Sequence, residues 1–181
     1  MAKAIKWITL ICGLIFGGLT IAYHLTWSEA ILPIAITALT FFYHFAMRLV
    51  VGLSINAIFK NKFNYTKAWF KEKNWEKKFF DFIKIKKWKK HLPTYAPSAF
   101  DPKQHSLEEI LGASCQAEIV HEVIMVLSFL PILLIIPFGE IAVFVVTSIL
   151  SCLFDSLFVL LQRFNRPRLI KILERNNRKN I

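Results

Sequence analysis

One uncharged stretch constrains this chain more than any other. Residues 7–27 read WITLICGLIFGGLTIAYHLTW, without a Lys, Arg, Asp or Glu, and a tryptophan stands at each end. On a helix Trp7 and Trp27 lie about 30 Å apart, which matches the hydrocarbon thickness of a bilayer and its two aromatic belts. The stretch therefore predicts a membrane-spanning helix. A cleaved signal peptide is the alternative, since Lys3 and Lys6 precede the run, but no small-residue cleavage pattern follows it.

Three more apolar stretches follow, at residues 30–59, 119–138 and 141–162. They explain why 55% of the 181 residues are hydrophobic, a share too high for a soluble protein of this size. We therefore predict an all-α fold: one integral membrane domain over residues 1–181, built as a four-helix bundle.

The basic residues predict the topology. The links at residues 28–29 and 137–140 contain no Lys or Arg, whereas Lys3, Lys6, a central segment at 60–118 and a tail at 163–181 are rich in them. By the positive-inside rule both termini and the central segment are cytoplasmic, in a multi-pass protein of the cell membrane. The net charge of +11 favours anionic membrane lipids as partners. Nucleic acid is not expected, because the basic residues adjoin membrane helices.

The central segment divides into three parts. Residues 63–90 alternate aromatic side chains with lysines, which predicts one or two helices lying at the inner membrane surface. Residues 92–102, LPTYAPSAFDP, hold three prolines and predict an ordered loop. Ser106 and Glu109 form a capping-box pattern, so a helix is expected to start there and continue into the third span.

Polar side chains gather near the cytoplasmic ends of the predicted spans. On a helix Glu118 and His121 are three residues apart and share a face, which Glu122 also borders. A charge in the middle of a span costs about 2.5–3.5 kcal/mol on insertion scales, so such groups pair or line a wet cavity. A histidine beside a carboxylate can act as a general base toward an alcohol.

The other spans carry polar residues at a similar predicted depth. His44 and Arg48 lie four residues apart on the second span, and Asp155 lies on the fourth. We predict that these three residues contribute to substrate binding. The alternative is structural, with Arg48 paired to Asp155 or Glu118 as a link between helices.

A metal site is a competing interpretation of Glu118 and His121, because Glu-x-x-His is the spacing of helical di-iron carboxylate proteins. Those proteins need a second motif of the same kind, and the sequence has none. We therefore expect no metal and no cofactor.

The fourth span ends in QRFNRPRL, residues 162–169. Arginines here suit bidentate binding of phosphate, and Pro167 is expected to break the helix after Arg166. The predicted substrate-binding residues of this motif are Gln162, Arg163, Asn165, Arg166 and Arg168.

Three sequence elements together resemble a known family. QRFNRPRL, the Ala-Glu-x-x-His of residues 117–121 and Trp88-Lys89 before Leu92-Pro93 are similar to the glycosyl-4,4'-diaponeurosporenoate acyltransferases, the last enzymes of staphyloxanthin synthesis. The resemblance extends over residues 75–169. The sequence departs from the family pattern at Gln116, where an arginine is common.

The resemblance implies a membrane acyltransferase that esterifies a hydroxyl of a glycosylated isoprenoid, or of another lipid-linked sugar, with a fatty acyl chain. The implied partners are an acyl donor, acyl-CoA or acyl carrier protein, and the lipid-linked acceptor. His121 would act as the base with Glu118 orienting it, and Trp88 and Lys89 would join the substrate-binding residues. A lipid-binding assembly protein and a small transporter stay open as alternatives.

Overall fold

The computed structural model describes residues 2–179, and no strand occurs in that range. Four helical segments are long and apolar enough to cross a membrane: Lys3–Thr26, Ile31–Phe59, Leu107–Phe138 and Ile141–Lys179. The prediction of an all-α protein with four membrane helices is therefore confirmed. The cytoplasmic position of the termini stays a prediction.

The chain forms two compact units. The first contains Met1–Leu53 and Val123–Asp155, and the second contains Ser54–Glu122 and Ser156–Ile181. Helices α2, α5 and α7 each contribute residues to both units. The single membrane domain over residues 1–181 stays a prediction.

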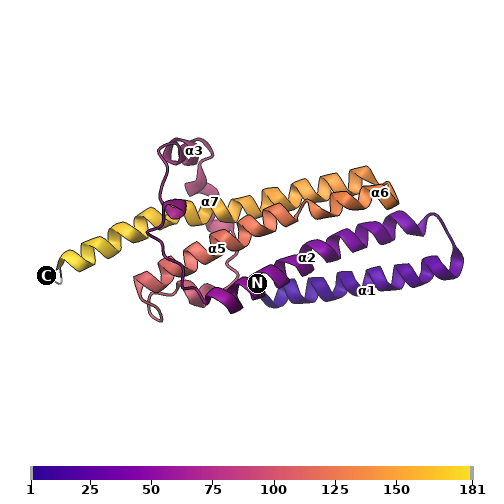
Figure 1. Ribbon diagram of the computed structural model, residues 1–181, viewed down its shortest axis with the longest axis horizontal. Helices are drawn as coiled ribbons and strands as arrows, with labels where there is room; N and C mark the ends of the chain where they lie inside the picture. Colours follow the sequence, from indigo (N-terminus) through magenta and orange to yellow (C-terminus); the bar gives the residue numbers. More distant parts are fainter. Residues whose placement is uncertain (1, 180–181) are drawn as a thin grey trace. The chain divides into compact units, whose positions relative to one another are not determined.

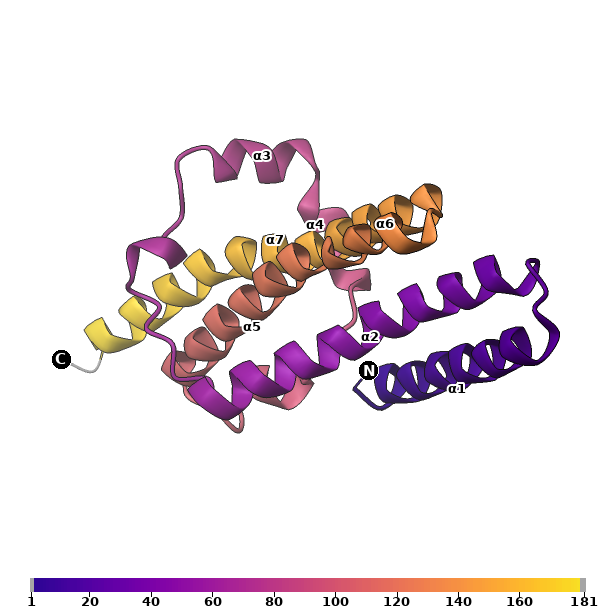
Figure 2. The same ribbon diagram turned by 45° about the vertical axis from the view of Figure 1, so that its right-hand side comes forward.

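Helices α1 (Ala2–Thr26) and α2 (Ile31–Phe59) form an antiparallel hairpin (Figures 1 and 2). Gly13 permits their close approach, because a Cβ there would lie 3.0 Å from the Phe42 ring. Trp7 and Trp27 are 64% and 71% exposed, as residues of an aromatic belt must be to meet lipid headgroups.

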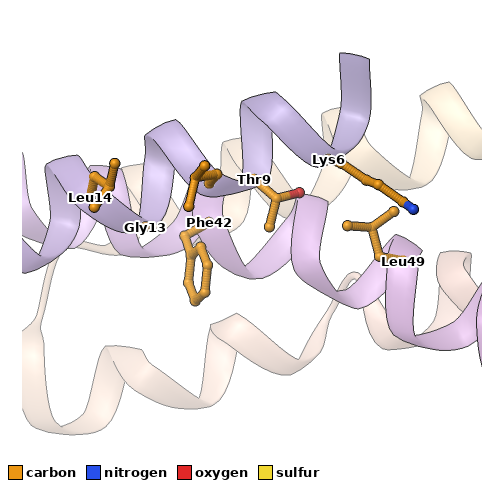
Figure 3. A pocket seen from close by; sticks show the side chains of 7 residues that line it. Lys6, Thr9, Gly13, Leu14, Phe42 and Leu49 are labelled. Carbon is orange, nitrogen blue, oxygen red and sulfur yellow. The ribbon is translucent and has the colours of Figure 1, made fainter. Parts of the chain in front are cut away.

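A shallow pocket of about 330 Å³ lies between these two helices (Figure 3). Its lining is almost wholly apolar and consists of Lys6, Thr9, Leu10, Gly13, Leu14, Phe42 and Leu49. Apart from Thr9 and Lys6, this lining offers no side chain able to take part in acyl transfer.

The central segment contains several short helices rather than one or two longer ones. They are η1 (Ala68–Phe70), α3 (Glu76–Phe82), α4 (Ile85–Trp88), η2 (Lys89–His91) and η3 (Pro97–Phe100). Lys84 separates α3 from α4 because its backbone adopts a left-handed conformation, with φ 52°. Phe70, Phe80 and Ile85 are buried and anchor the segment.

Helix α5 (Leu107–Leu127) begins at the predicted capping box. The Ser106 N–H donates to Glu109 Oε2 over 2.8 Å, and the Glu109 N–H donates to Ser106 Oγ over 3.2 Å. Gly112 lies so close to the end of α2 that a Cβ would overlap the Asn61 carbonyl oxygen. The start of α5 is therefore fixed both by its cap and by backbone contact.

Helix α5 ends because of Pro131, which has no N–H to donate to the Leu127 carbonyl. The Tyr43 hydroxyl donates to that carbonyl instead, over 2.8 Å. Beyond this break the chain continues as η4 (Leu130–Leu134) and α6 (Ile135–Phe138), so the third span is interrupted.

Helix α7 runs without a break from Ile141 to Lys179, with Pro167 inside it. The prediction that Pro167 ends this helix after Arg166 is therefore wrong. Proline in a helix interior costs about 3 kcal/mol, because it removes one hydrogen bond and crowds the preceding turn. Contacts of Arg163 and Arg166, described below, fix the helix on the N-terminal side of the proline and offset that cost.

Candidate functional site

A buried network of four charges lies in the second unit. The Arg163 guanidinium contacts Glu76 Oε1 through Nε and Glu118 Oε1 through Nη1, both over 2.5 Å. Arg166 Nη2 forms an ion pair with Glu118 Oε2. Glu118, Glu76 and Arg166 are each at most 1% exposed. Two positive and two negative charges thus neutralise one another away from solvent, as buried charges must.

Three elements supply these charges. Arg163 and Arg166 lie three residues apart on α7 and face the same side, and Glu118 lies on α5, which runs beside α7 (Figures 1 and 2). Glu76 is the first residue of α3. The network therefore attaches the central segment to the pair of long helices.

The same two arginines bind three successive backbone carbonyls of the turn at residues 69–71, which we call the clamped turn. Arg163 donates to the Trp69 and Lys71 oxygens over 3.1 and 3.2 Å. Arg166 donates to the Phe70 oxygen over 3.3 Å and stacks on the Phe70 ring. Every hydrogen bond fixes the turn further, so the network holds it in one conformation.

His121 and Glu122 lie beside the network on α5. The His121 ring stacks on Phe158, with centroids 4.6 Å apart and an angle of 9° between the planes. The Trp69 indole N–H donates to Glu122 Oε2 over 3.1 Å. Both Glu118 oxygens contact arginines, and orientation of His121 by Glu118 stays a prediction.

Lys89 and Asn165 form a second polar group in the second unit. Lys89 Nζ donates to Asn165 Oδ1 over 3.0 Å and lies 4.7 Å from the centre of the Phe164 ring. Burial lowers the pKa of Lys89, and repulsion from Arg168 and Lys86 lowers it further. Lys89, Arg168 and Lys86 therefore repel one another here, and an anionic ligand bound among them would reduce that repulsion.

Two other predicted residues have structural partners nearby. The Trp88 indole N–H donates to the Ile83 carbonyl over 3.0 Å, which holds α4 against the end of α3. Gln162 Oε1 accepts a hydrogen bond from Ser114 Oγ over 3.0 Å, which links α7 to α5. Their role in substrate binding stays a prediction.

His44, Arg48 and Asp155 belong to the first unit. Arg48 forms an ion pair with Asp155 and donates to Ser151 Oγ over 2.9 Å. The contact between Arg48 and Asp155 that the structural alternative expects is therefore present. His44 is 5% exposed, and its ring nitrogens meet no hydrogen-bond partner within residues 2–179. Substrate binding by these three residues stays a prediction.

Metal-binding side chains do not gather in the part of the chain that the structure describes. Nowhere in residues 2–179 do three or more His, Cys, Asp or Glu side chains come close enough together to hold a metal ion. The Glu-x-x-His spacing therefore meets no further ligands there.

Comparison with known families identifies the chain. The family model of the glycosyl-4,4'-diaponeurosporenoate acyltransferases matches residues 66–175, more than half of the sequence. The chain belongs to this family. With its four membrane-length helices, this family member is a membrane acyltransferase. No curated protein and no solved structure is similar enough to count as a match.

The family match includes the four-charge network, His121 and the Lys89–Asn165 pair. Helices α1 and α2 precede it, so the hairpin that carries His44 and Arg48 lies outside the part of the chain that the family shares. Gln116 connects the two parts: its side chain binds the Asn56 amide oxygen and the Asn61 N–H at the end of α2.

Sequence reasoning missed Glu76 and Trp69. Glu76 lies among lysines in NWEKK and has the local pattern of a solvated surface residue. One indication was present: a fourth span ending in several arginines needs carboxylates if any of them is buried. Trp69 is one of several aromatic residues between lysines in this segment, and nothing local distinguishes it.

Proposed function

We propose that this acyltransferase transfers a fatty acyl group from a thioester donor to a hydroxyl of a lipid-linked sugar, at the cytoplasmic face of the cell membrane. The observation that carries the proposal is that the family match contains both a histidine suited to act as base and a cationic group suited to an anionic donor. Those are His121 and the Lys89–Asn165 pair. A glycosylated isoprenoid is the acceptor that the family name favours.

His121 acts as the general base. As the acceptor oxygen attacks the acyl carbonyl carbon, His121 takes the hydroxyl proton, so that a neutral alcohol becomes a competent nucleophile. An ester C–O bond forms and the thioester C–S bond breaks. His121 then gives the proton to the leaving thiolate. Its stacking on Phe158 supports this role by limiting rotation of the ring.

Lys89, Asn165 and Arg168 hold the anionic head of the donor, acyl-CoA or acyl carrier protein. Lys89 and Arg168 repel one another, so a phosphate placed between them is stabilised by both charges. The loop at residues 92–102 follows Lys89 by three residues and is placed to cover the bound head. Arg168 is exposed and free to turn toward it.

Arg163, Arg166 and Glu118 act by positioning. Their charges are already compensated inside the second unit, and their hydrogen bonds hold the clamped turn and α3. Arg163 and Arg166 therefore support the residues that meet substrate instead of binding the donor directly, and Glu118 holds these two arginines.

The base assignment is tested in membranes from cells that produce equal amounts of the wild type and its variants. Product ester is quantified by mass spectrometry. We expect His121→Ala to lose at least about a hundredfold in ester formation, the usual contribution of a general base. His91→Ala, which removes an exposed histidine of the central segment, should retain the wild-type rate. Full activity of His121→Ala would refute the assignment.

The membrane face is tested by cysteine labelling in a version without the three native cysteines. A membrane-impermeant maleimide should label Ser28→Cys in intact cells and Lys103→Cys only after permeabilisation. The reverse pattern would place the central segment outside the cell and would contradict the proposed topology.

A further inference from the structure

The clamped turn presents one aromatic side chain outward. Its central residue, Phe70, is 5% exposed, whereas its first residue, Trp69, is 60% exposed. The buried Arg166 and the largely buried Arg163, compensated by two buried glutamates, hold the carbonyls of the turn. Taking three charges out of water and largely covering a fourth is a costly way to hold a loop, and the exposed aromatic ring is what it fixes in place.

The Trp69 ring is also fixed at its tip. Its indole N–H donates to Glu122 Oε2 over 3.1 Å, so the ring is held at both its backbone and its polar end. A tryptophan that only anchors a protein to the membrane directs its N–H toward headgroups and water. Here the N–H is directed to a carboxylate of the same unit, and the apolar faces of the ring remain available.

Trp75 shows what an exposed tryptophan of the same segment looks like without these restraints. It is 56% exposed, almost the same as Trp69, and its ring lies edge-on to Phe79 at 5.9 Å between centroids. Its carbonyl accepts the Phe79 N–H over 3.1 Å, a hydrogen bond along α3. Trp69 and Trp75 are about equally exposed, but only the Trp69 backbone carbonyl is held by Arg163 and only the Trp69 N–H binds the Glu122 carboxylate.

We propose that Trp69 and Glu122 form the binding site for the sugar ring of the acceptor lipid. The C–H face of a pyranose stacks on the indole, and a ring hydroxyl donates to the Glu122 carboxylate. Glu122 follows His121 on α5, so the sugar site lies on the same helical turn as the proposed base. This inference rests on the proposed function and names the residues that would select a sugar over a simple alcohol.

Binding is measured apart from activity, with the full chain in lipid nanodiscs and methyl β-D-glucopyranoside as the probe. Saturation-transfer NMR reports contact between the protein and the sugar ring protons, and glycerol serves as a polyol without a ring face. We expect sugar ring signals with the wild type and with Trp75→Ala. With Trp69→Ala and Glu122→Gln the dissociation constant should rise about fivefold or more. Glycerol should give no saturation-transfer signal with the wild type or with any of the variants.

Trp69→Phe protects the test against loss of fold, because it keeps one aromatic ring and removes the five-membered ring with its N–H. It should bind the sugar more tightly than Trp69→Ala and more weakly than the wild type. Equal binding by Trp69→Ala and Trp75→Ala, or wild-type binding by Glu122→Gln, would overturn the inference.

An activity measurement separates this inference from the proposed function. If the inference holds, Trp69→Ala and Glu122→Gln raise KM for a glycosylated acceptor and leave KM for the acyl donor unchanged. Sugar binding without any ester formation would sink the proposed function and leave the binding site standing. If Trp75→Ala and Trp69→Ala reduced ester formation equally, the sugar-binding site would be refuted and the proposed acyl transfer would stand.

Discussion

Replacing Glu118 by glutamine should destabilise the protein more than any other single loss of charge in the second unit. Glutamine preserves the shape of the side chain and removes one negative charge from a network of two arginines and two glutamates. Arg163 retains Glu76, but Arg166 loses the carboxylate that neutralises it. Arg166 is 1% exposed and cannot turn to solvent without moving α7.

The size of the effect follows from burial. Removing one partner of a buried ion pair costs about 3–5 kcal/mol, because the remaining charge is left uncompensated. Removing an exposed carboxylate changes stability by less than about 0.5 kcal/mol. Glu72→Gln is the matched control, since Glu72 lies on the same segment and is exposed.

The assay is reversible unfolding in mixed micelles, followed by circular dichroism at increasing fractions of denaturing detergent. Glu118→Gln should lose several kcal/mol, whereas Glu72→Gln should match the wild type. Adding Arg166→Met to Glu118→Gln should recover part of the loss, because the uncompensated charge is then absent. Equal stability of Glu118→Gln and Glu72→Gln would refute the argument that the network is buried and neutral.

Three further predictions concern other contacts. Gly112→Ala should cost about 1–3 kcal/mol in unfolding free energy because its Cβ meets backbone, whereas Gly52→Ala, in open space, should add about 0.5–1 kcal/mol. Asp155→Asn should destabilise the first unit by leaving Arg48 unpaired, and the double variant Arg48→Met with Asp155→Leu should restore much of the loss in the same assay. Lys89 has a folded pKa below its ordinary value of 10.5, so its charge opposes folding below the folded pKa and this penalty fades as pH rises toward 10.5. The wild type should therefore gain stability relative to Lys89→Gln across that range, and a constant difference between the two would contradict the lowered pKa.

The apolar spans and the helix start were predictable because each depends on neighbouring residues. A run without charges specifies a membrane helix wherever it lies, and the capping box at Ser106 and Glu109 is closed within one helical turn. The end of α5 depends partly on a distant residue: Pro131 was visible in the sequence, but the Tyr43 hydroxyl that binds the freed Leu127 carbonyl was not.

The Arg48–Asp155 ion pair was among the alternatives that the sequence offered, whereas the partners of Glu118 were not predictable. Glu118 and His121 share a helix face, which suggested that the carboxylate serves the histidine. The structure shows that the Glu118 oxygens contact Arg163 and Arg166. The same arginines explain why the helix continues through Pro167, since tertiary contacts outweigh the local preference of one residue. Local patterns identified the polar residues, whereas their partners depended on the packing of α3, α5 and α7.

Acyl transfer at this site is tested by extracting total lipids from cells with the protein, without it, and with His121→Ala at equal abundance, and comparing all esters by mass spectrometry. One ester of a glycosylated lipid should be present only with the wild type, and its two halves then identify the acyl chain and the acceptor. An unchanged set of esters in all three samples would contradict the acyl-transfer function proposed for this site.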